Sequence, residues 1–259
     1  ELLDEYRLGP LRDAIHTLHR PPPSVDLQAL EDGAHWAQHR LAFEELLAHQ
    51  LAMLRLRAQI RSHEAPAMPP GKELPGMFLG RLGFGLTGAQ QRVGAEVARD
   101  LQQRQPMLRL IQGDVGSGKT VVAAMAALQA LEAGWQVALM APTEILAEQH
   151  FNNFSAWLAP LGISVAWLAG KLKGKTRQNQ LQMIATGDPA MVVGTHALFQ
   201  GEVQFHNLGL AIIDEQHRFG VQQRLALRDK GAAGQFSPHQ LIMTATPIPR
   251  TLTLTAFGD

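Results

Sequence analysis

Residues 113–120 read GDVGSGKT, and this octapeptide decides the fold of the chain. It fits the pattern G-x-x-x-x-G-K-[ST], in which glycines let the backbone wrap a phosphate chain and the lysine reaches the β- and γ-phosphates. The apolar run at residues 108–112 predicts a strand before the loop, and the run after it predicts a helix that ends at Gly134. This order of elements predicts a nucleotide-binding site, and the alternative is a glycine-rich turn with an incidental lysine.

The loop is expected to supply most of the contacts to the nucleotide. Backbone N–H groups at the start of the following helix would face the phosphates, where the helix adds partial positive charge. The hydroxyl group at the last position of the pattern would also hold Mg²⁺. The residues expected to bind the nucleotide in this loop are Gly113, Gly116, Ser117, Gly118, Lys119 and Thr120.

The composition is that of a globular protein. A chain of 259 residues, with 46% hydrophobic and 18% charged residues, can form one large α/β domain with a small appendage. Lys plus Arg equals Asp plus Glu at 23 each, so binding of nucleic acid would have to depend on local sites. The absence of cysteine excludes a disulfide scaffold and a thiolate metal site, and it fits a reducing, cytoplasmic location. No apolar run is long enough to span a membrane, and the eleven histidines show no ligand-like spacing, so we expect surface or structural roles for them.

The character of the sequence changes near residue 80. Before it, a proline break precedes a short helix that Asp26 would cap, and a long helix is predicted from about Ala34 to Ile60. Residues 64–76 are rich in proline and glycine and indicate a linker. We therefore predict a helical segment at residues 1–80 and a second domain at 81–259; the alternative for the long helix is a surface helix of the main domain. The first residue is not methionine, and we expect the chain to be a piece of a longer protein.

After residue 80, short apolar runs alternate with helical patterns. The runs lack polar alternation, as expected of parallel strands that are buried on both faces. The alternation predicts an α/β fold with a doubly wound, mostly parallel sheet, whose ligands bind at the carboxyl ends of the strands. Strands are expected within residues 108–111, 136–141, 190–194, 210–214 and 241–246, and helices within 89–103, 120–133, 144–158, 175–186 and 221–228.

The second half of the predicted nucleotide site is the run LAIIDEQH at residues 210–217. It places Asp214 and Glu215 at the end of an apolar strand. Mg²⁺ requires hard oxygen ligands, so Asp214 is expected to hold it opposite Thr120, while Glu215 orients and deprotonates the attacking water. With Lys119, these carboxylates are the expected catalytic residues. The alternative is an acidic pair that caps the next helix.

Together these motifs resemble those of the superfamily-two helicases, which carry a DExH box on a RecA-like P-loop NTPase domain. The runs DEQHRFGVQQR (214–224) and TATPIPRTL (244–252) are similar, more narrowly, to the branch-migration helicases of bacteria. Transcription-repair coupling translocases share the second run, but Gln216 and the run LTGAQ (86–90) favour the branch-migration helicases. Residues 40–52 also resemble the helix that joins the wedge domain of those enzymes to their motor.

The resemblance implies further nucleotide contacts upstream of the glycine loop. The run FGLTGAQ (84–90) is similar to the Q motif, so Gln90 is implied to read the adenine edge and Phe84 to make an apolar or stacking contact. Gly83 stands where the family often has proline. The alternative is that Thr87 caps an ordinary helix.

The resemblance also implies a DNA-binding surface and its coupling to the nucleotide. Residues 140–150 and 193–198 are similar to motifs Ia and Ib, and the lysine-rich run at 168–177 to a loop that contacts the tracking strand; the alternatives are a plain turn, a structural histidine and a solvated lysine loop. The DNA-binding residues so implied are Pro142, Thr143, Gly170, Lys171, Lys173, Thr195 and His196. The residues implied to couple nucleotide state to DNA grip, by hydrogen bonding between His217 and a threonine of motif III, are His217, Thr244 and Thr246.

The resemblance implies an ATP-dependent DNA helicase or translocase that acts in recombination and repair. Its ligands would be ATP and Mg²⁺, and its partners duplex and branched DNA, a second RecA-like domain and a wedge domain of the same full-length chain, in a monomer. Arginines from the second domain would complete the site, so the fragment alone should hydrolyse ATP very slowly. The alternatives from other classes are a P-loop kinase, a transporter ATPase, whose LSGGQ signature the sequence lacks, and a nucleotide-binding switch without motor activity.

Overall fold

The computed structural model describes residues 5–6, 8–61, 64–168, 174–188, 190–215 and 236–245. By its internal contacts the chain forms two compact units, one that includes residues 1–59 and one of residues 60–247. The boundary therefore falls earlier in the sequence than the expected one near residue 80. None of the described helices combines the length and the apolar character that crossing a bilayer requires.

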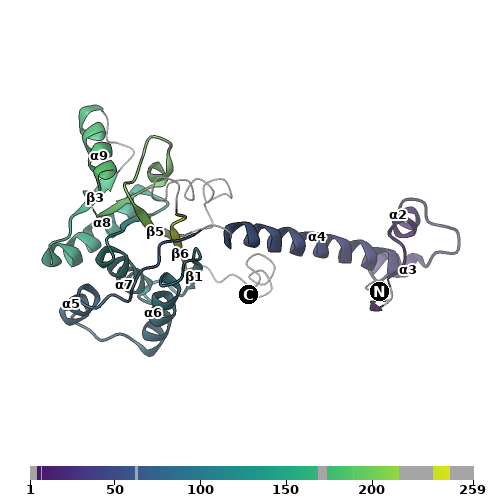
Figure 1. Cartoon of the computed structure of the whole chain (residues 1–259). Helices are drawn as coiled ribbons and strands as arrows, with labels where there is room; N and C mark the ends of the chain where they lie inside the picture. The colour runs from purple at the N-terminus through teal and green to yellow at the C-terminus, as the bar shows by residue number, and fades with distance from the viewer. Residues whose placement is uncertain are drawn as a thin grey trace. The chain divides into compact units, whose positions relative to one another are not determined.

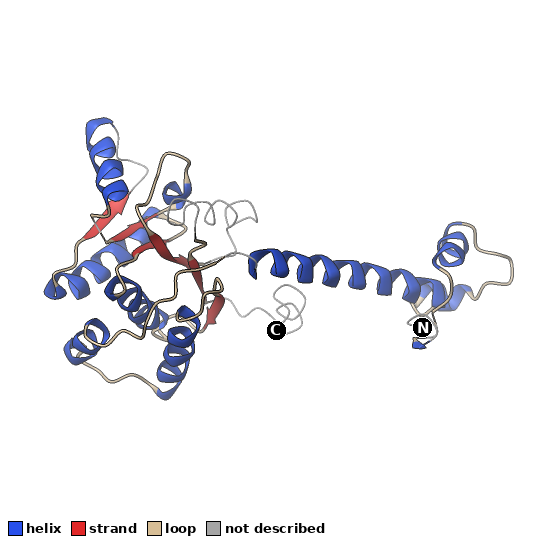
Figure 2. Cartoon of the chain, in the orientation of Figure 1, coloured by secondary structure: helices blue, strands red, loops and turns tan. Residues whose placement is uncertain are grey.

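The smaller unit is helical (Figure 2). The side chain of Asp26 accepts a hydrogen bond from the Ala29 amide at 3.1 Å, which is the predicted helix cap. Arg40 is buried and donates from Nε to the Gly9 carbonyl at 2.9 Å, so it ties the long helix to the segment before the first helix. The helices are α2 (Leu11–His19), α3 (Leu27–Glu31) and α4 (Trp36–Arg61).

The larger unit contains a six-stranded sheet in the order β1-β6-β5-β2-β4-β3, and all of its strand pairs are parallel (Figure 1). This confirms the predicted α/β fold. Five of these strands were predicted from the sequence, whereas β3, which lies at the lateral edge of the sheet and is mostly half-buried, was not. The strands are β1 (Leu108–Gln112), β2 (Gln136–Met140), β3 (Val165–Leu168), β4 (Met191–Gly194), β5 (Leu208–Asp214) and β6 (His239–Thr244).

Helices cover both faces of the sheet, as a doubly wound fold requires. In β5, Leu210 and Ile212 join one core cluster with α6, α7 and α8, whereas Ala211 and Ile213 join a second cluster with α9. This alternation follows from the two-residue period of a strand. Four predicted helices are found within one or two residues of their predicted bounds, and the predicted helix at residues 221–228 lies outside the described residues. The helices are α5 (Leu74–Arg81), α6 (Gly88–Leu101), α7 (Lys119–Glu132), α8 (Glu144–Leu158) and α9 (Gly174–Thr186), with 3-10 turns η1 (Ala159–Leu161) and η2 (His196–Phe199).

Residues 64–81, which the sequence analysis assigned to the helical segment, pack on the sheet unit. Met68 is fully buried in the first core cluster, and its carbonyl accepts a hydrogen bond from the buried Gln129 of α7 at 3.1 Å. Phe78 of α5 belongs to the same cluster. The proline- and glycine-rich stretch is thus a strap held on the sheet unit rather than a free linker.

The last residue of α7, Glu132, fixes the start of α5. Its carboxylate accepts hydrogen bonds from the backbone amides of Lys72, Glu73 and Leu74 at 3.0, 3.1 and 3.1 Å. Burial alone would raise the pKa of Glu132, but the three backbone hydrogen bonds lower it below the ordinary value. The side chain therefore acts as a helix cap supplied from elsewhere in the chain.

Candidate functional site

The two halves of the predicted nucleotide site lie at the carboxyl ends of two strands, β1 and β5. In the parallel register, Gln112 of β1 pairs with Thr244 of β6, and Asp214 of β5 pairs with Met243 of β6. Strands β1 and β5 therefore flank β6, and their ends are separated by roughly 10 Å, since neighbouring strands lie about 4.8 Å apart. That spacing suits phosphates and a cation held between the glycine loop and the carboxylates.

The glycine loop has the backbone conformation that its sequence predicts. Gly116 and Gly118 have φ values of 82° and 80°, in the left-handed region that glycine tolerates. A Cβ atom on Gly118 would lie 2.2 Å from Nε2 of Gln90, so a larger residue here would also displace the Gln90 side chain. Lys119, the first residue of α7, donates from Nζ to the carbonyls of Gly113 and Asp114 at 2.6 and 2.9 Å.

Gln90 has two structural roles in the described contacts. It forms a capping box with Thr87: the Thr87 amide donates to Oε1 at 2.8 Å, and the Gln90 amide donates to the threonine hydroxyl at 3.3 Å. Its Nε2 donates to the Ser117 carbonyl at 3.0 Å, which ties α6 to the glycine loop. A primary amide has a second N–H and a second lone pair, so adenine recognition stays a compatible prediction. Phe84 is 55% exposed and available for stacking.

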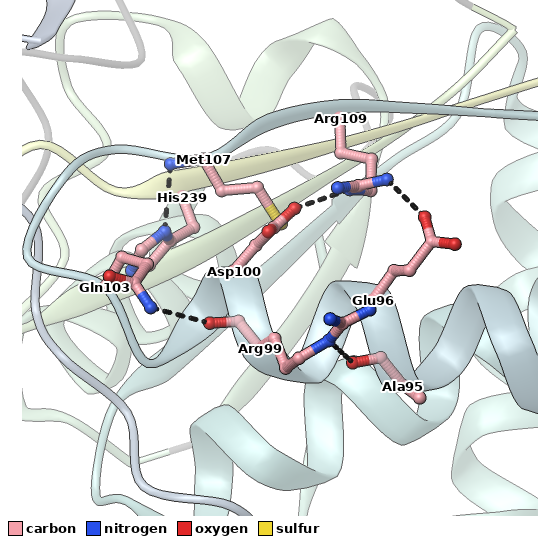
Figure 3. Close-up of polar contacts among 8 residues, drawn as sticks. All are labelled: Ala95, Glu96, Arg99, Asp100, Gln103, Met107, Arg109 and His239. Carbon is pink, nitrogen blue, oxygen red and sulfur yellow. Dashed lines mark hydrogen bonds and ion pairs between the residues drawn. The ribbon is translucent and has the colours of Figure 1, made fainter.

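The strand that leads into the glycine loop is anchored to α6 (Figure 3). Arg109 of β1 forms ion pairs with Asp100 at 2.5 Å and with Glu96 at 2.8 Å. Burial alone would lower the pKa of Arg109, but the hydrogen bonds and charges of Asp100 and Glu96 raise it. The anchor fixes β1 relative to α6, the helix that carries Gln90.

Glu215 is held by β6, the strand between β1 and β5, and by the residue that follows it. Its amide donates to the Met243 carbonyl at 2.8 Å, and its carboxylate accepts from the Ala245 amide at 3.0 Å and from the Thr244 hydroxyl at 3.4 Å. Its φ is 54°, a left-handed conformation that costs a non-glycine residue about 1–3 kcal/mol and often marks a functional position. The helix that the acidic pair would cap in the alternative interpretation lies outside the described residues, so that alternative stays open.

The predicted coupling residues are only partly described. His217 and Thr246 lie outside the described residues, so a hydrogen bond between them and motif III stays a prediction. Thr244 is described, and its hydroxyl donates a hydrogen bond to the Glu215 carboxylate. Sequence reasoning missed this link because nothing in the spacing of residues 214–244 indicates which side chains meet.

The predicted DNA-binding residues follow β2, β4 and β3, the three strands on the other side of the sheet. Thr143 caps α8 by accepting a hydrogen bond from the Leu146 amide at 3.3 Å, next to the half-buried Pro142. Thr195 is buried at 4% exposure, whereas His196 is exposed, so His196 is the member of this pair whose side chain a phosphate can reach. Three further predicted contacts lie outside the described residues: Gly170, Lys171 and Lys173.

One residue close to the site was not predicted. His150, near the middle of α8, lies with Nε2 2.7 Å from Oδ2 of Asp214. The side chains are 10% and 14% exposed, so the contact is shielded from water. The only available signal was the position of a histidine at the end of a motif Ia-like run, and histidine in a helix does not by itself indicate a site.

The donor set fits a magnesium ion that shares its coordination with phosphates. Thr120 and Asp214 supply a hydroxyl and a carboxylate oxygen, the hard ligands that Mg²⁺ prefers. Within the described residues no group of three or more His, Cys, Asp or Glu side chains could hold a metal ion. A cation here would therefore depend on phosphate and water oxygens, which is how Mg²⁺ is held at nucleotide sites.

Comparison with known proteins identifies the class to which this fold and site belong. The DEAD/DEAH box helicase family matches residues 88–255, so the chain belongs to that family. Within it the chain is similar to the ATP-dependent DNA helicase RecG. The RecG of Escherichia coli K12 is 61% identical over 96% of this chain and 36% of its own length, and that of Acidithiobacillus ferridurans is 49% identical over 98% and 36%.

A solved structure supports the same relationship. The structure of RecG bound to a three-way DNA junction aligns with 99% of this chain and 33% of its own, with a TM-score of 0.80 and 40% identity. The chain thus spans about a third of the length of the relatives it matches. The helical unit at residues 8–61 falls within the aligned part, so the similarity extends beyond the sheet unit.

Proposed function

We propose that this chain is the ATP-binding half of a DNA motor, which acts as a cytoplasmic monomer. The intact protein couples ATP hydrolysis to translocation on duplex DNA and remodels branched DNA in recombination and repair. The observation that carries the proposal is that the glycine loop after β1 and the carboxylates at the end of β5 lie on either side of β6, at the carboxyl ends of the strands. The three-way junction in the RecG structure supports branched DNA as the substrate.

Different residues of this chain have separate roles in phosphoryl transfer. Amides of the glycine loop bind the phosphates, and Lys119 leaves the Gly113 and Asp114 carbonyls to contact the β- and γ-phosphates. Thr120 and Asp214 would hold Mg²⁺, which would supply positive charge beside the phosphate oxygens. Glu215, oriented by the Ala245 amide, accepts the proton of the attacking water.

The second RecA-like domain of the intact protein completes the site. Arginines supplied in this way account for about a 10³- to 10⁵-fold effect in related phosphoryl transfer. This chain alone should therefore bind nucleotide but turn it over very slowly. The strands β2, β4 and β3 present the DNA contacts, with branched DNA positioned further by the wedge domain of the same full-length chain.

The proposal is tested by ATPase assays of the intact protein with a three-way junction, with linear duplex and without DNA. We expect stimulation that is largest with the junction. Glu215→Gln should keep nucleotide binding and lose at least about 100-fold in turnover, because general-base catalysis contributes about 10²–10⁴-fold. Lys119→Ala should lose nucleotide affinity. Glu148→Gln, an exposed glutamate on α8, is the matched control and should behave as wild type; equal turnover of the two glutamate variants would contradict the assignment.

A further inference from the structure

The contact between His150 and Asp214 joins two parts of the molecule that the proposed mechanism treats separately. Asp214 ends β5, which belongs to the nucleotide side of the sheet, and His150 belongs to α8, which follows β2 on the DNA side. The two residues are 64 positions apart in the chain, and their side chains meet at 2.7 Å. Strands β5 and β2 are neighbours in the sheet, so the contact lies where the two sides meet.

The strand period explains why these side chains meet. Leu210 and Ile212 of β5 face the core cluster that includes α7 and α8. A period of two residues places Asp214 on the same face as these two. On α8, Phe154 lies in this cluster, and His150 is one helical turn before it on the same side of the helix.

The surroundings of the ring indicate which nitrogen carries the proton. His150 is buried, and its Nδ1 has no hydrogen-bond partner among the described residues. A buried N–H that lacks a partner costs about 1–3 kcal/mol, and more where the group is charged. The proton therefore belongs on Nε2, from which it is donated to Oδ2 of Asp214.

This hydrogen bond constrains the carboxylate that the proposed function assigns to the cation. The terminal torsion of aspartate is broad, so an unsupported carboxylate samples many orientations. Donation to Oδ2 fixes the plane of the group and leaves Oδ1 free of this hydrogen bond. Partners that orient a metal ligand in this way commonly change metal affinity by about 10- to 100-fold when they are removed.

We propose that His150 is a positioning residue that fixes the Asp214 carboxylate for Mg²⁺ and ties it to the helix that begins at the predicted DNA contact. Thr143 caps α8, and His150 follows seven residues later, about 10 Å along the helix axis. A shift of α8 on DNA would therefore reach Asp214 through one rigid element. The inference rests on the proposed function, because it assumes that Asp214 serves the nucleotide-bound cation.

The test measures the affinity of the intact protein for ADP that carries a fluorescent label, with Mg²⁺ and with EDTA. The ratio of the two affinities is the gain that the cation provides. His150→Met removes the donor and His150→Gln keeps a donor near the Nε2 position, while the two side chains have similar size. We expect the Met variant to lose about tenfold or more of the Mg²⁺-dependent gain and to keep its affinity in EDTA. The Gln variant should retain most of the Mg²⁺-dependent gain.

Phe154→Leu is the control for a general loss of packing in α8. Phe154 is fully buried one turn further along the helix, so this variant should lose stability but retain the gain. If the Met variant does not fold, His150→Asn, whose amide ends at the Nδ1 position, makes the same comparison with His150→Gln. The proposed role of His150 would be overturned if the Met or Asn variant kept the wild-type Mg²⁺-dependent gain. It would also be overturned if the Phe154→Leu variant lost as much of this gain as the Met variant. A wild-type protein without nucleotide binding would overturn the proposed function as well.

Discussion

His239 makes the stability of the sheet unit depend on pH. This fully buried residue begins β6, and its side chain joins the sheet to the strap. The Met107 amide donates to its Nδ1 at 3.0 Å, a contact drawn in Figure 3, and its Nε2 donates to the Pro66 carbonyl at 2.9 Å. Burial lowers the pKa of His239 below 6.5, although the bond to Pro66 and the charge of Asp100 offset part of the effect.

The direction and size of the effect follow from proton linkage. In the unfolded chain His239 takes up a proton near pH 6.5, whereas burial disfavours the charged ring in the folded protein. Its Nδ1 also already accepts a hydrogen bond from the Met107 amide. The stability that His239 contributes is therefore fully present above the pKa of the unfolded chain. It is lost as the pH falls below that pKa toward the lower pKa of the folded protein. Because a group with an unfolded pKa near 6.5 takes up about one proton between pH 7.5 and 5.5, the loss over this range is at most about 1.4 kcal/mol.

Urea unfolding at these two pH values, followed by circular dichroism, measures the effect. Other groups also titrate in this range, so the informative quantity is the difference between wild type and His239→Gln, which cannot titrate. We expect the Gln variant to be less stable at pH 7.5, since it cannot keep both hydrogen bonds. The wild type should lose more stability than the variant on acidification, by up to about 1.4 kcal/mol. An equal loss in the two proteins would refute the reasoning.

Three further substitutions test the supports of the site. Gly118→Ala would place a Cβ atom 2.2 Å from Nε2 of Gln90 at φ 80°; it should cost about 1–2 kcal/mol and lower nucleotide affinity, whereas Gly80→Ala, with open space around it, should not. Binding of labelled ADP compares them. Glu132→Gln should lower the melting temperature by about 2–4 °C, corresponding to about 1 kcal/mol, because the amide offers one acceptor oxygen to the strap. Arg109→Met should cost about 1 kcal/mol in urea unfolding at low salt and less at high salt, because its ion pairs are partly exposed.

The local parts of the nucleotide site could be predicted because they depend on backbone chemistry. The left-handed conformation at Gly116 and Gly118 follows from a loop that must wrap phosphates, and glycine is the residue that tolerates it. Burial on both faces predicted the parallel strands, and their shared direction brought Asp214 and the loop to one edge. These features are written in short stretches of sequence.

Contacts between distant segments could not be predicted in the same way. Proline and glycine at residues 64–76 indicated a linker, but the same residues also suit an extended strap whose polar groups bond to side chains such as Gln129 and His239. The partners of Asp214 and Glu215 likewise depend on which side chains converge at the sheet edge. Periodicity gives the face on which a residue lies, and it does not give the residue that approaches from another element.

The arrangement of the strands suggests where coupling between nucleotide and DNA has to occur. Within the sheet, β5 is hydrogen-bonded to both β6 and β2, so the strands themselves are poor candidates for relative movement. Movement is easier at the carboxyl ends of the strands, where side chains rather than backbone hydrogen bonds connect neighbouring elements. Such connections meet at the end of β5, where Glu215 contacts Thr244 and Ala245, and Asp214 contacts His150. A nucleotide that draws on both carboxylates would therefore act on β6 and on α8 at once, and only the second of these elements begins at the predicted DNA contacts.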